Sequence, residues 1–304
     1  MAIGPDRGEG RAQSSAPSDS APSGQGGTRD LTRRVTSAAL LAPIVLACTY
    51  AGGWIFLALC TIAAAVVLWE WTSLAAGRGE LRVLAPGFLA LLAAALLLGF
   101  NMPGVSLGVV ASGVVLIGLV AAAWPGLPPH RLALSWTAGG LVYAGALLLG
   151  PAVLRADPQW GLIALLFVLA TVWATDIFAF FCGRTIGGPL LWQQISPKKT
   201  WSGAAGGLCG GLAAGVAVAY ASGIGKLGII GVMALLLSVV AQAGDLFESA
   251  VKRHFGVKDT SGLIPGHGGL MDRIDGFLFA GAAALLIGIL RAGTDAPAYG
   301  LLVW

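Results

Sequence analysis

Long apolar segments alternate with short polar ones along most of the 304-residue chain. A helix that crosses a bilayer needs about 20 mainly apolar residues, because each residue advances it by about 1.5 Å through a hydrocarbon layer of about 30 Å. Nine segments meet this requirement, and turn-forming glycines and prolines separate several of them. The predicted spans are 34–51, 53–73, 84–101, 104–124, 133–153, 160–182, 201–222, 226–250 and 274–292. The pattern therefore predicts an all-α, polytopic integral membrane protein, a bundle of about nine transmembrane helices.

Composition agrees with this pattern and excludes an ordinary soluble domain. Hydrophobic residues make up 57% of the chain and charged residues 11%, whereas about a quarter of the residues in a soluble domain are charged. The formal charge of +4 does not indicate nucleic acid, because the lysines and arginines lie in short loops and form no single basic face. Membrane lipid is the expected surrounding, and no nucleic-acid partner is expected.

The chain divides into three predicted regions. Residues 1–31 are rich in Gly, Ser and Pro and poor in large apolar side chains, so they are expected to form a disordered tail. The tail lacks the apolar core of a cleaved signal peptide. Residues 32–155 are predicted to form N-terminal transmembrane helices, and residues 156–304 a C-terminal transmembrane region that carries the chemistry.

The basic residues predict the orientation of the chain. Lys and Arg are concentrated in short cytoplasmic loops of membrane proteins. If the N-terminus is cytoplasmic, all but three of the 18 lysines and arginines lie on the cytoplasmic side, the exceptions being Arg155, Lys226 and Arg291. We therefore expect a multi-pass protein of the cell (inner) membrane with a cytoplasmic tail, and loops 183–200 and 251–273 on the cytoplasmic side.

Acidic residues in a membrane span are costly and are functional-site candidates by default. Five lie in or at the ends of predicted spans: Glu70, Asp176, Asp245, Glu248 and Asp272. Two interpretations of Glu70 stay open, because tryptophans flank it on both sides and such residues are common at membrane interfaces. It is either a solvated interfacial residue or part of a site.

The strongest cluster of charges follows the eighth span. Asp245, Glu248, Ser249 and Lys252 are spaced so that they share one helix face. The next loop is short, charged and rich in glycine. Carboxylates suit Mg²⁺, which binds proteins through a few carboxylates and substrate phosphates. Basic side chains bind phosphate oxygens, and the glycines at 266, 268 and 269 let backbone amides approach an anion. This combination predicts metal-assisted phosphoryl or nucleotidyl transfer at the membrane surface.

A second anion site is predicted where the seventh span begins. Asp176 lies about two turns inside the sixth span. Ser196 before Pro197 predicts a helix start, which places Lys198, Lys199 and Thr200 near the positive end of the helix dipole. Taken alone, these lysines are explained better by a helix start that follows the charge bias of cytoplasmic loops.

Residues 249–275 carry a specific resemblance. Ser249, Lys252-Arg253, Lys258-Asp259, Pro265-Gly266-His267-Gly268-Gly269 and Asp272-Arg273-Ile-Asp275 together resemble the signature of the phosphatidate cytidylyltransferases (CDP-diacylglycerol synthases). Asp176, the Ser196 to Thr200 segment and the nine-span pattern are also similar to that family, whereas the first five helices resemble it only in hydropathy. Phe180 and Ser202 depart from the family pattern, which often has Tyr and Glu or Gln there.

The resemblance implies the reaction of CTP with phosphatidate to give CDP-diacylglycerol and pyrophosphate in phospholipid biosynthesis. It implies Mg²⁺, with a second, monovalent cation as an option, and a homodimer. It assigns Asp245 and Asp272 to the metal and Asp245, Asp272, Lys252 and Lys258 to catalysis. The remaining positions are expected to bind substrate: Asp176, Ser196, Lys198, Lys199, Thr200, Ser249, Arg253, Asp259, His267, Gly268, Gly269, Arg273 and Asp275.

Two other functions are weighed against this one. A membrane transporter also uses acids within the membrane, but it predicts charges near the midplane on several helices rather than at one cytoplasmic margin. A CTP-dependent polyprenol or lipid kinase would phosphorylate a lipid alcohol, and it is expected to lack the full pattern from Lys258 to Asp275.

Overall fold

The computed structural model describes residues 40–76, 80–123, 134–264 and 268–304. Within these ranges, eight helices are long and apolar enough to cross a membrane, and the shorter apolar helix Leu40–Ala51 precedes them. This confirms the predicted all-α, multi-pass membrane fold. The first of the nine predicted spans is described only from residue 40 onward, and the predicted tail 1–31 lies outside the described residues.

The helices begin and end close to the predicted boundaries. They are α2 (Gly53–Ala75), α3 (Leu81–Gly99), α4 (Pro103–Ala122), α5 (Leu134–Ala156), α6 (Gly161–Thr185), α7 (Trp201–Ala221), α8 (Leu227–His254), α9 (Met271–Ala292) and the short α10 (Pro297–Leu302). The sequence did not predict α10. It also underestimated the length of α8, whose last turn is polar and continues past the apolar segment.

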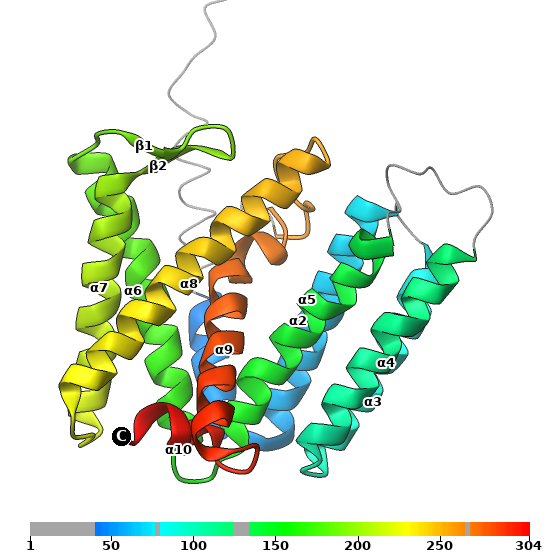
Figure 1. The fold of residues 1–304 in the computed structure, drawn as a ribbon, viewed down its shortest axis with the longest axis horizontal. Helices are drawn as coiled ribbons and strands as arrows, with labels where there is room; N and C mark the ends of the chain where they lie inside the picture. Colours follow the sequence, from blue (N-terminus) through cyan, green and yellow to red (C-terminus); the bar gives the residue numbers. More distant parts are fainter. Residues whose placement is uncertain (1–39, 77–79, 124–133, 265–267) are drawn as a thin grey trace, which may run out of the picture.

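The long helices stand side by side and alternate in direction (Figure 1). Helices α6 and α7 form one side of the bundle, α3 and α4 form the other, and α9 lies between them. Helix α8 runs diagonally across the face shown in Figure 1, from beside α7 at one end towards α2 and α5 at the other. The chain ends at the face opposite the strands, beyond α10.

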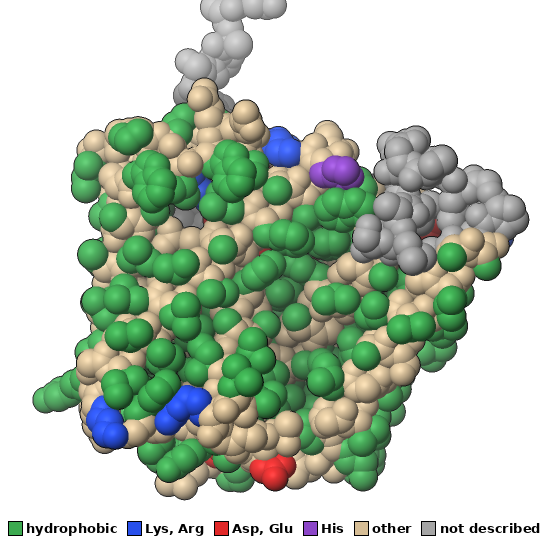
Figure 2. All heavy atoms as spheres, viewed as in Figure 1, with side chains coloured by type: hydrophobic (Ala, Val, Ile, Leu, Met, Phe, Trp, Pro, Cys, Tyr) green, Lys and Arg blue, Asp and Glu red, His purple; other side chains and the backbone are tan. Residues whose placement is uncertain are grey.

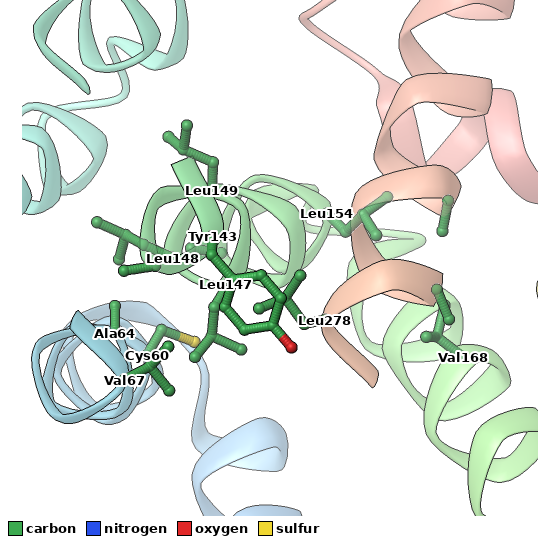
Figure 3. Packing of buried hydrophobic residues seen from close by; sticks show 14 of the residues in the cluster. Cys60, Ala64, Val67, Tyr143, Leu147, Leu148, Leu149, Leu154, Val168 and Leu278 are labelled. Carbon is green, nitrogen blue, oxygen red and sulfur yellow. The ribbon is translucent and has the colours of Figure 1, made fainter. Parts of the chain in front are cut away.

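Buried apolar side chains join the two sides of the bundle. Cys60, Ala64 and Val67 of α2 face Tyr143 and Leu147 of α5 (Figure 3), and Leu278 of α9 and Val168 of α6 belong to the same cluster. Outside this core, much of the surface is apolar between the two ends of the bundle, and the few charged side chains in view lie towards those ends (Figure 2). A wide apolar belt is what a protein surrounded by lipid requires.

Glycines allow α6 and α7 to pack closely, as expected for small residues in a membrane bundle. A Cβ atom at Gly203 would lie 2.8 Å from the carbonyl oxygen of Ala179, and one at Gly207 would lie 3.0 Å from that of Thr175. One turn further along α7, a Cβ at Gly211 would lie 2.5 Å from Oγ1 of Thr175. These three positions leave no room for a larger side chain without a shift of α6.

The predicted helix start at Ser196 is wrong. Residues Ser196–Thr200 form strand β2, which pairs antiparallel with β1 (Leu190–Trp192). The φ of proline suits an extended strand as well as a first helical turn, and pairing with β1 decides the outcome at Pro197. Helix α7 instead begins at Trp201, where Oγ1 of Thr200 accepts a hydrogen bond from the Gly203 amide at 3.1 Å and so caps the helix.

The hairpin and the charged end of α8 lie at the same end of the bundle (Figure 1). Arg155, Lys226 and Arg291 lie at the opposite end, where α5 and α9 finish and α8 begins. Among the described residues, the two groups of basic residues therefore lie at opposite ends of the bundle, as the predicted orientation requires. Which end faces the cytoplasm stays a prediction.

Candidate functional site

A cavity of about 680 Å³ opens at the hairpin end of the bundle. Its walls come from α6, the β1–β2 hairpin, α7, α8 and the first turns of α9. The residues that line it are Asp176, Ala179, Phe180, Gly183, Arg184, Leu191, Ser196, Lys198, Lys199, Thr200, Gly203, Ala204, Gln242, Asp245, Asp272, Arg273 and Asp275.

Charged side chains dominate the polar part of this lining. Four are acidic (Asp176, Asp245, Asp272, Asp275) and four are basic (Arg184, Lys198, Lys199, Arg273). Lys199 forms an ion pair with Asp245, which joins the hairpin to α8. The structure thus brings together nine of the residues predicted for the site: Asp176, Ser196, Lys198, Lys199, Thr200, Asp245, Asp272, Arg273 and Asp275.

Three carboxylates converge at the wall formed by α8 and α9. Oxygen atoms of Asp245, Glu248 and Asp275 all lie within 4.8 Å of one another. The three residues come from consecutive turns of α8 and from the second turn of α9. Hard oxygen ligands at this separation suit a divalent cation such as Mg²⁺.

Glu248 was recognised in the sequence as an acid on the right helix face but was not assigned to the site. Its side chain is 1% exposed. Oε2 lies 2.7 Å from Nζ of Lys252, while Oε1 is buried and has no hydrogen-bond partner within the described part of the chain. A buried carboxylate oxygen without a partner is costly, and a bound cation would satisfy it. The donor set therefore fits a metal.

Asp272 accepts several hydrogen bonds from the protein that the sequence did not predict. Its Oδ1 accepts a hydrogen bond from Nζ of Lys252 at 2.8 Å. Its Oδ2 accepts from the backbone amide and the hydroxyl of Thr260, both at 3.0 Å, and from the Gly269 amide at 2.8 Å. Asp245 and Asp272 both line the cavity, but Asp272 also holds the loop before α9 in place. Its role as a metal ligand stays a prediction.

The glycines of the signature loop pack closely against carboxylates. Gly268 has φ +86°, a conformation that favours glycine, and a Cβ atom there would lie 2.8 Å from Oδ2 of Asp272. A Cβ at Gly269 would lie 2.6 Å from Oε1 of Glu70 and would clash with Oγ1 of Thr260. These two glycines therefore let the loop pack closely against Asp272 and Glu70. Gly268 and Gly269 are not among the described residues that line the cavity.

Glu70 is not a solvated interfacial residue. It lies in α2 with 0% of its surface exposed, far along the chain from the residues that it contacts. Its Oε1 accepts hydrogen bonds from the Ser261 hydroxyl at 2.6 Å and the Leu270 amide at 2.9 Å. Its Oε2 accepts from the Met271 amide at 2.7 Å.

Several predicted residues lie outside the cavity lining. Lys252 lies between Glu248 and Asp272 and contacts both carboxylates. Nε of Arg253 lies 3.5 Å from the carbonyl oxygen of Ile195 in the hairpin. Ser249, Lys258 and Asp259 are not among the lining residues either, and His267 lies outside the described residues.

Other lining residues were not predicted at all. Arg184 is a basic residue at the end of α6, and Gln242 lies one turn before Asp245 on α8. Gln242 could have been found from its helical spacing, since it precedes Asp245 by three residues. Leu191 belongs to strand β1, whereas the sequence predicted only a loop over 183–200, and no sequence signal indicated that Leu191 lines the cavity.

Comparison with known proteins covers most of the chain. The family model of the cytidylyltransferase family matches residues 32–290. The phosphatidate cytidylyltransferase of Brucella suis biovar 1 (strain 1330) is 38% identical over 279 residues, which is 88% of this chain and 97% of that protein. The phosphatidate cytidylyltransferase of Bacillus subtilis (strain 168) is 40% identical over 130 residues, 41% of this chain and 47% of that protein.

The similarity is thus broader than the sequence motifs indicated. The signature and its neighbours suggested a close resemblance over the C-terminal half alone, whereas the family match begins at residue 32 and includes the N-terminal helices. The Brucella relative likewise aligns over nearly its whole length. On these grounds, the chain belongs to the cytidylyltransferase family.

Proposed function

We propose that this chain is a phosphatidate cytidylyltransferase that converts CTP and phosphatidate to CDP-diacylglycerol and pyrophosphate. The observation that carries the proposal is the near full-length similarity to a phosphatidate cytidylyltransferase. The cavity supports it, because four acidic and four basic side chains surround one space at the end of a membrane bundle. A nucleotide from water and a lipid headgroup from the leaflet can both reach such a position.

The reaction needs positioning more than proton transfer. A phosphate oxygen of phosphatidate attacks the α-phosphorus of CTP, the new P–O bond forms, and the bond to the β-phosphate breaks to release pyrophosphate. The attacking oxygen of a phosphate monoester is already largely ionised near neutral pH. The protein therefore has to align the two phosphates and offset their negative charge.

The basic residues of the cavity are suited to that task. Lys198 and Lys199 lie on β2, Arg184 at the end of α6 and Arg273 at the start of α9. They approach the space from three elements, so they can contact phosphates from several sides. Lys199 already pairs with Asp245, and it would exchange this carboxylate for a phosphate when the nucleotide binds.

A divalent cation is proposed at Asp245, Glu248 and Asp275, with Asp272 beside them. When bound, Mg²⁺ would neutralise charge on the triphosphate and the leaving pyrophosphate. Lys252 forms ion pairs with both Glu248 and Asp272 and so fixes the two carboxylates relative to each other. Lys252 thus orients the proposed ligand Glu248, and Thr260 orients the neighbouring Asp272, before the substrates arrive.

The proposed setting is the cell membrane with the cavity on the cytoplasmic side. The reason is the position of the basic residues, since most of those that the structure describes lie at the cavity end. CTP would then enter from the cytoplasm, and phosphatidate from the inner leaflet. Association into a homodimer is part of the proposal through the family resemblance alone.

The test uses the purified full-length protein in detergent with labelled CTP, phosphatidate and Mg²⁺. Formation of a CDP-lipid together with pyrophosphate is the expected result. Replacing phosphatidate by diacylglycerol or by a polyprenol should give no labelled lipid, because neither has the attacking phosphate. Transfer of a phosphoryl group to the polyprenol would instead identify a lipid kinase and overturn the proposal.

A further inference from the structure

A buried carboxylate of the N-terminal half contacts the loop and helix that carry the site acids. Glu70 of α2 accepts three hydrogen bonds from described residues, and the three donors are Ser261, Leu270 and Met271. The separation along the sequence is about 190 to 200 residues. No solvent reaches this carboxylate. Among the described residues, its hydrogen-bond donors therefore all lie in the segment that precedes and begins α9.

Helix α9 has no capping side chain at its N-cap position, and the Glu70 carboxylate takes that place. The residue at its N-cap position is Leu270, whose side chain makes no capping hydrogen bond. The first amides of a helix have no partners within the helix. Glu70 accepts from two of them, those of Leu270 and Met271, and its negative charge lies at the positive end of the helix dipole. The carboxylate thus does from another helix what an N-cap side chain does locally.

The capped turn leads directly into the acidic wall of the cavity. Asp272 follows Met271, and Asp275 lies about one turn further on. Asp272 also binds Thr260, the neighbour of the Ser261 that donates to Glu70. The absence of a side chain at Gly269 lets the Glu70 carboxylate reach this turn. Any shift of the turn would therefore move Asp272 and Asp275 relative to Asp245 on α8.

We propose that Glu70 is a positioning residue for the reaction: its carboxylate fixes the start of α9 and so the place of Asp272 and Asp275 in the cavity. The inference rests on the proposed cytidylyltransferase function for its catalytic consequence, but not for the contact itself. Glu70 does not line the cavity and is not proposed to touch either substrate.

The test is the variant Glu70→Gln, which keeps the shape and removes the charge. One carboxylate oxygen becomes an NH₂ group, which would face a donor amide of α9. We expect kcat to fall by about tenfold or more and the half-saturating Mg²⁺ concentration to rise by about tenfold, as for residues that orient metal ligands. Hydrogen exchange followed by mass spectrometry should show faster exchange of the amides of 268–273, with α5 and α6 unchanged.

The matched control is Glu80→Gln. Glu80 precedes α3 at the same end of the bundle, and its side chain makes no capping hydrogen bond. It should retain wild-type turnover, Mg²⁺ requirement and exchange. A purely structural role of Glu70 would lower the amount of folded protein without changing the Mg²⁺ requirement of the remainder. Glu70→Gln protein with wild-type exchange at 268–273 and a wild-type Mg²⁺ requirement would overturn the proposal.

A second variant decides the matter if Glu70→Gln does not accumulate in membranes. Ser261→Ala removes one of the three donors to Glu70; faster exchange at 268–273 with reduced kcat upholds the proposal, and no change in either overturns it. The two proposals fail differently. A wild-type protein that makes no CDP-lipid refutes the function, whereas an active wild-type protein matched by Glu70→Gln refutes only the positioning role.

Discussion

Each half of the bundle contains a buried glutamate, and the two differ in how they are satisfied. Glu70 of α2 is fully buried, and both of its oxygens accept hydrogen bonds. Glu248 of α8 is equally buried, but its Oε1 has no partner within the described residues. A satisfied buried carboxylate stabilises one arrangement, while an unsatisfied one is costly until a ligand binds. The comparison separates a residue that holds the site from one that is prepared to bind.

The same contrast extends to the surroundings of the two residues. Helices α2–α5 contribute none of the residues that line the site cavity, and their buried side chains form most of the apolar core. The cavity is built from α6 to α9 and the hairpin. We infer that the N-terminal half serves the reaction through packing and through Glu70, and that the second half supplies the chemistry.

The largest expected effect comes from Asp245→Asn. This change removes a charge from the three-carboxylate cluster and the partner of Lys199. Turnover should fall by about 100-fold or more, the size of effect seen when preorganised electrostatic stabilisation is lost. The measurement is CDP-lipid formation in detergent. Asp295→Asn, an exposed carboxylate at the opposite end of the bundle, is the control and should stay within about twofold of wild type. Equal activity of the two variants would exclude the proposed cluster.

Glu248→Gln should raise the Mg²⁺ requirement by about tenfold or more, because it weakens a proposed ligand. Removal of divalent cations by EDTA should stop turnover in the wild-type protein, and added Mg²⁺ should restore it. Unlike Glu70→Gln, this variant should leave amide exchange at 268–273 as in wild type, since the amides of 269–271 donate to Asp272 and Glu70 rather than to Glu248. A wild-type Mg²⁺ titration would show that Glu248 is not a ligand.

Lys199→Ala is expected to raise the KM for CTP by about tenfold or more, which corresponds to the loss of one charge-assisted hydrogen bond of about 1.5–3 kcal/mol. The lysine lies on the hairpin and faces the cavity. Lys226→Ala, at the start of α8 at the opposite end of the bundle, should not change the KM. If both lysines behave alike, Lys199 does not contact the nucleotide.

The smallest effect concerns packing rather than chemistry. Gly207→Val places extra atoms between α6 and α7, where a Cβ alone would lie 3.0 Å from a carbonyl oxygen. Overpacking of this kind costs about 1–3 kcal/mol, so the thermal midpoint should fall. Gly108→Ala in α4 meets nothing within 4 Å, and it should leave the midpoint unchanged or slightly higher. Equal midpoints for the two variants would argue against close contact of α6 and α7.

Hydropathy alone predicted the helices well because lipid imposes a length and an apolar composition on each span. The predicted span 201–222 corresponds to Trp201–Ala221, and 160–182 to Gly161–Thr185. The errors lie in polar segments, where that constraint is absent. Ser196–Thr200 forms a strand, and the last turn of α8 extends to His254.

The site was predictable where its residues are close in sequence. Asp272 and Asp275 belong to one motif, and Asp245 precedes it on the helix face that also carries Glu248. The role of Glu70 was not predictable, because nothing local to α2 indicates which of about 200 later residues will donate to it. Similarly, periodicity identified Glu248 as polar, but only the structure shows that one of its oxygens lacks a partner.

The diagonal course of α8 has a mechanical consequence. Helices that stand side by side can slide along one another lengthwise. A helix that crosses them obliquely and contacts both sides of the bundle restricts this sliding. Helix α8 crosses the bundle in this way. It starts beside α7, and near its other end His254 stacks on Trp136 of α5 with ring centroids 4.6 Å apart. Because Asp245 and Glu248 lie in the last turns of the same helix, this contact also fixes the end of α8 that carries them relative to α5.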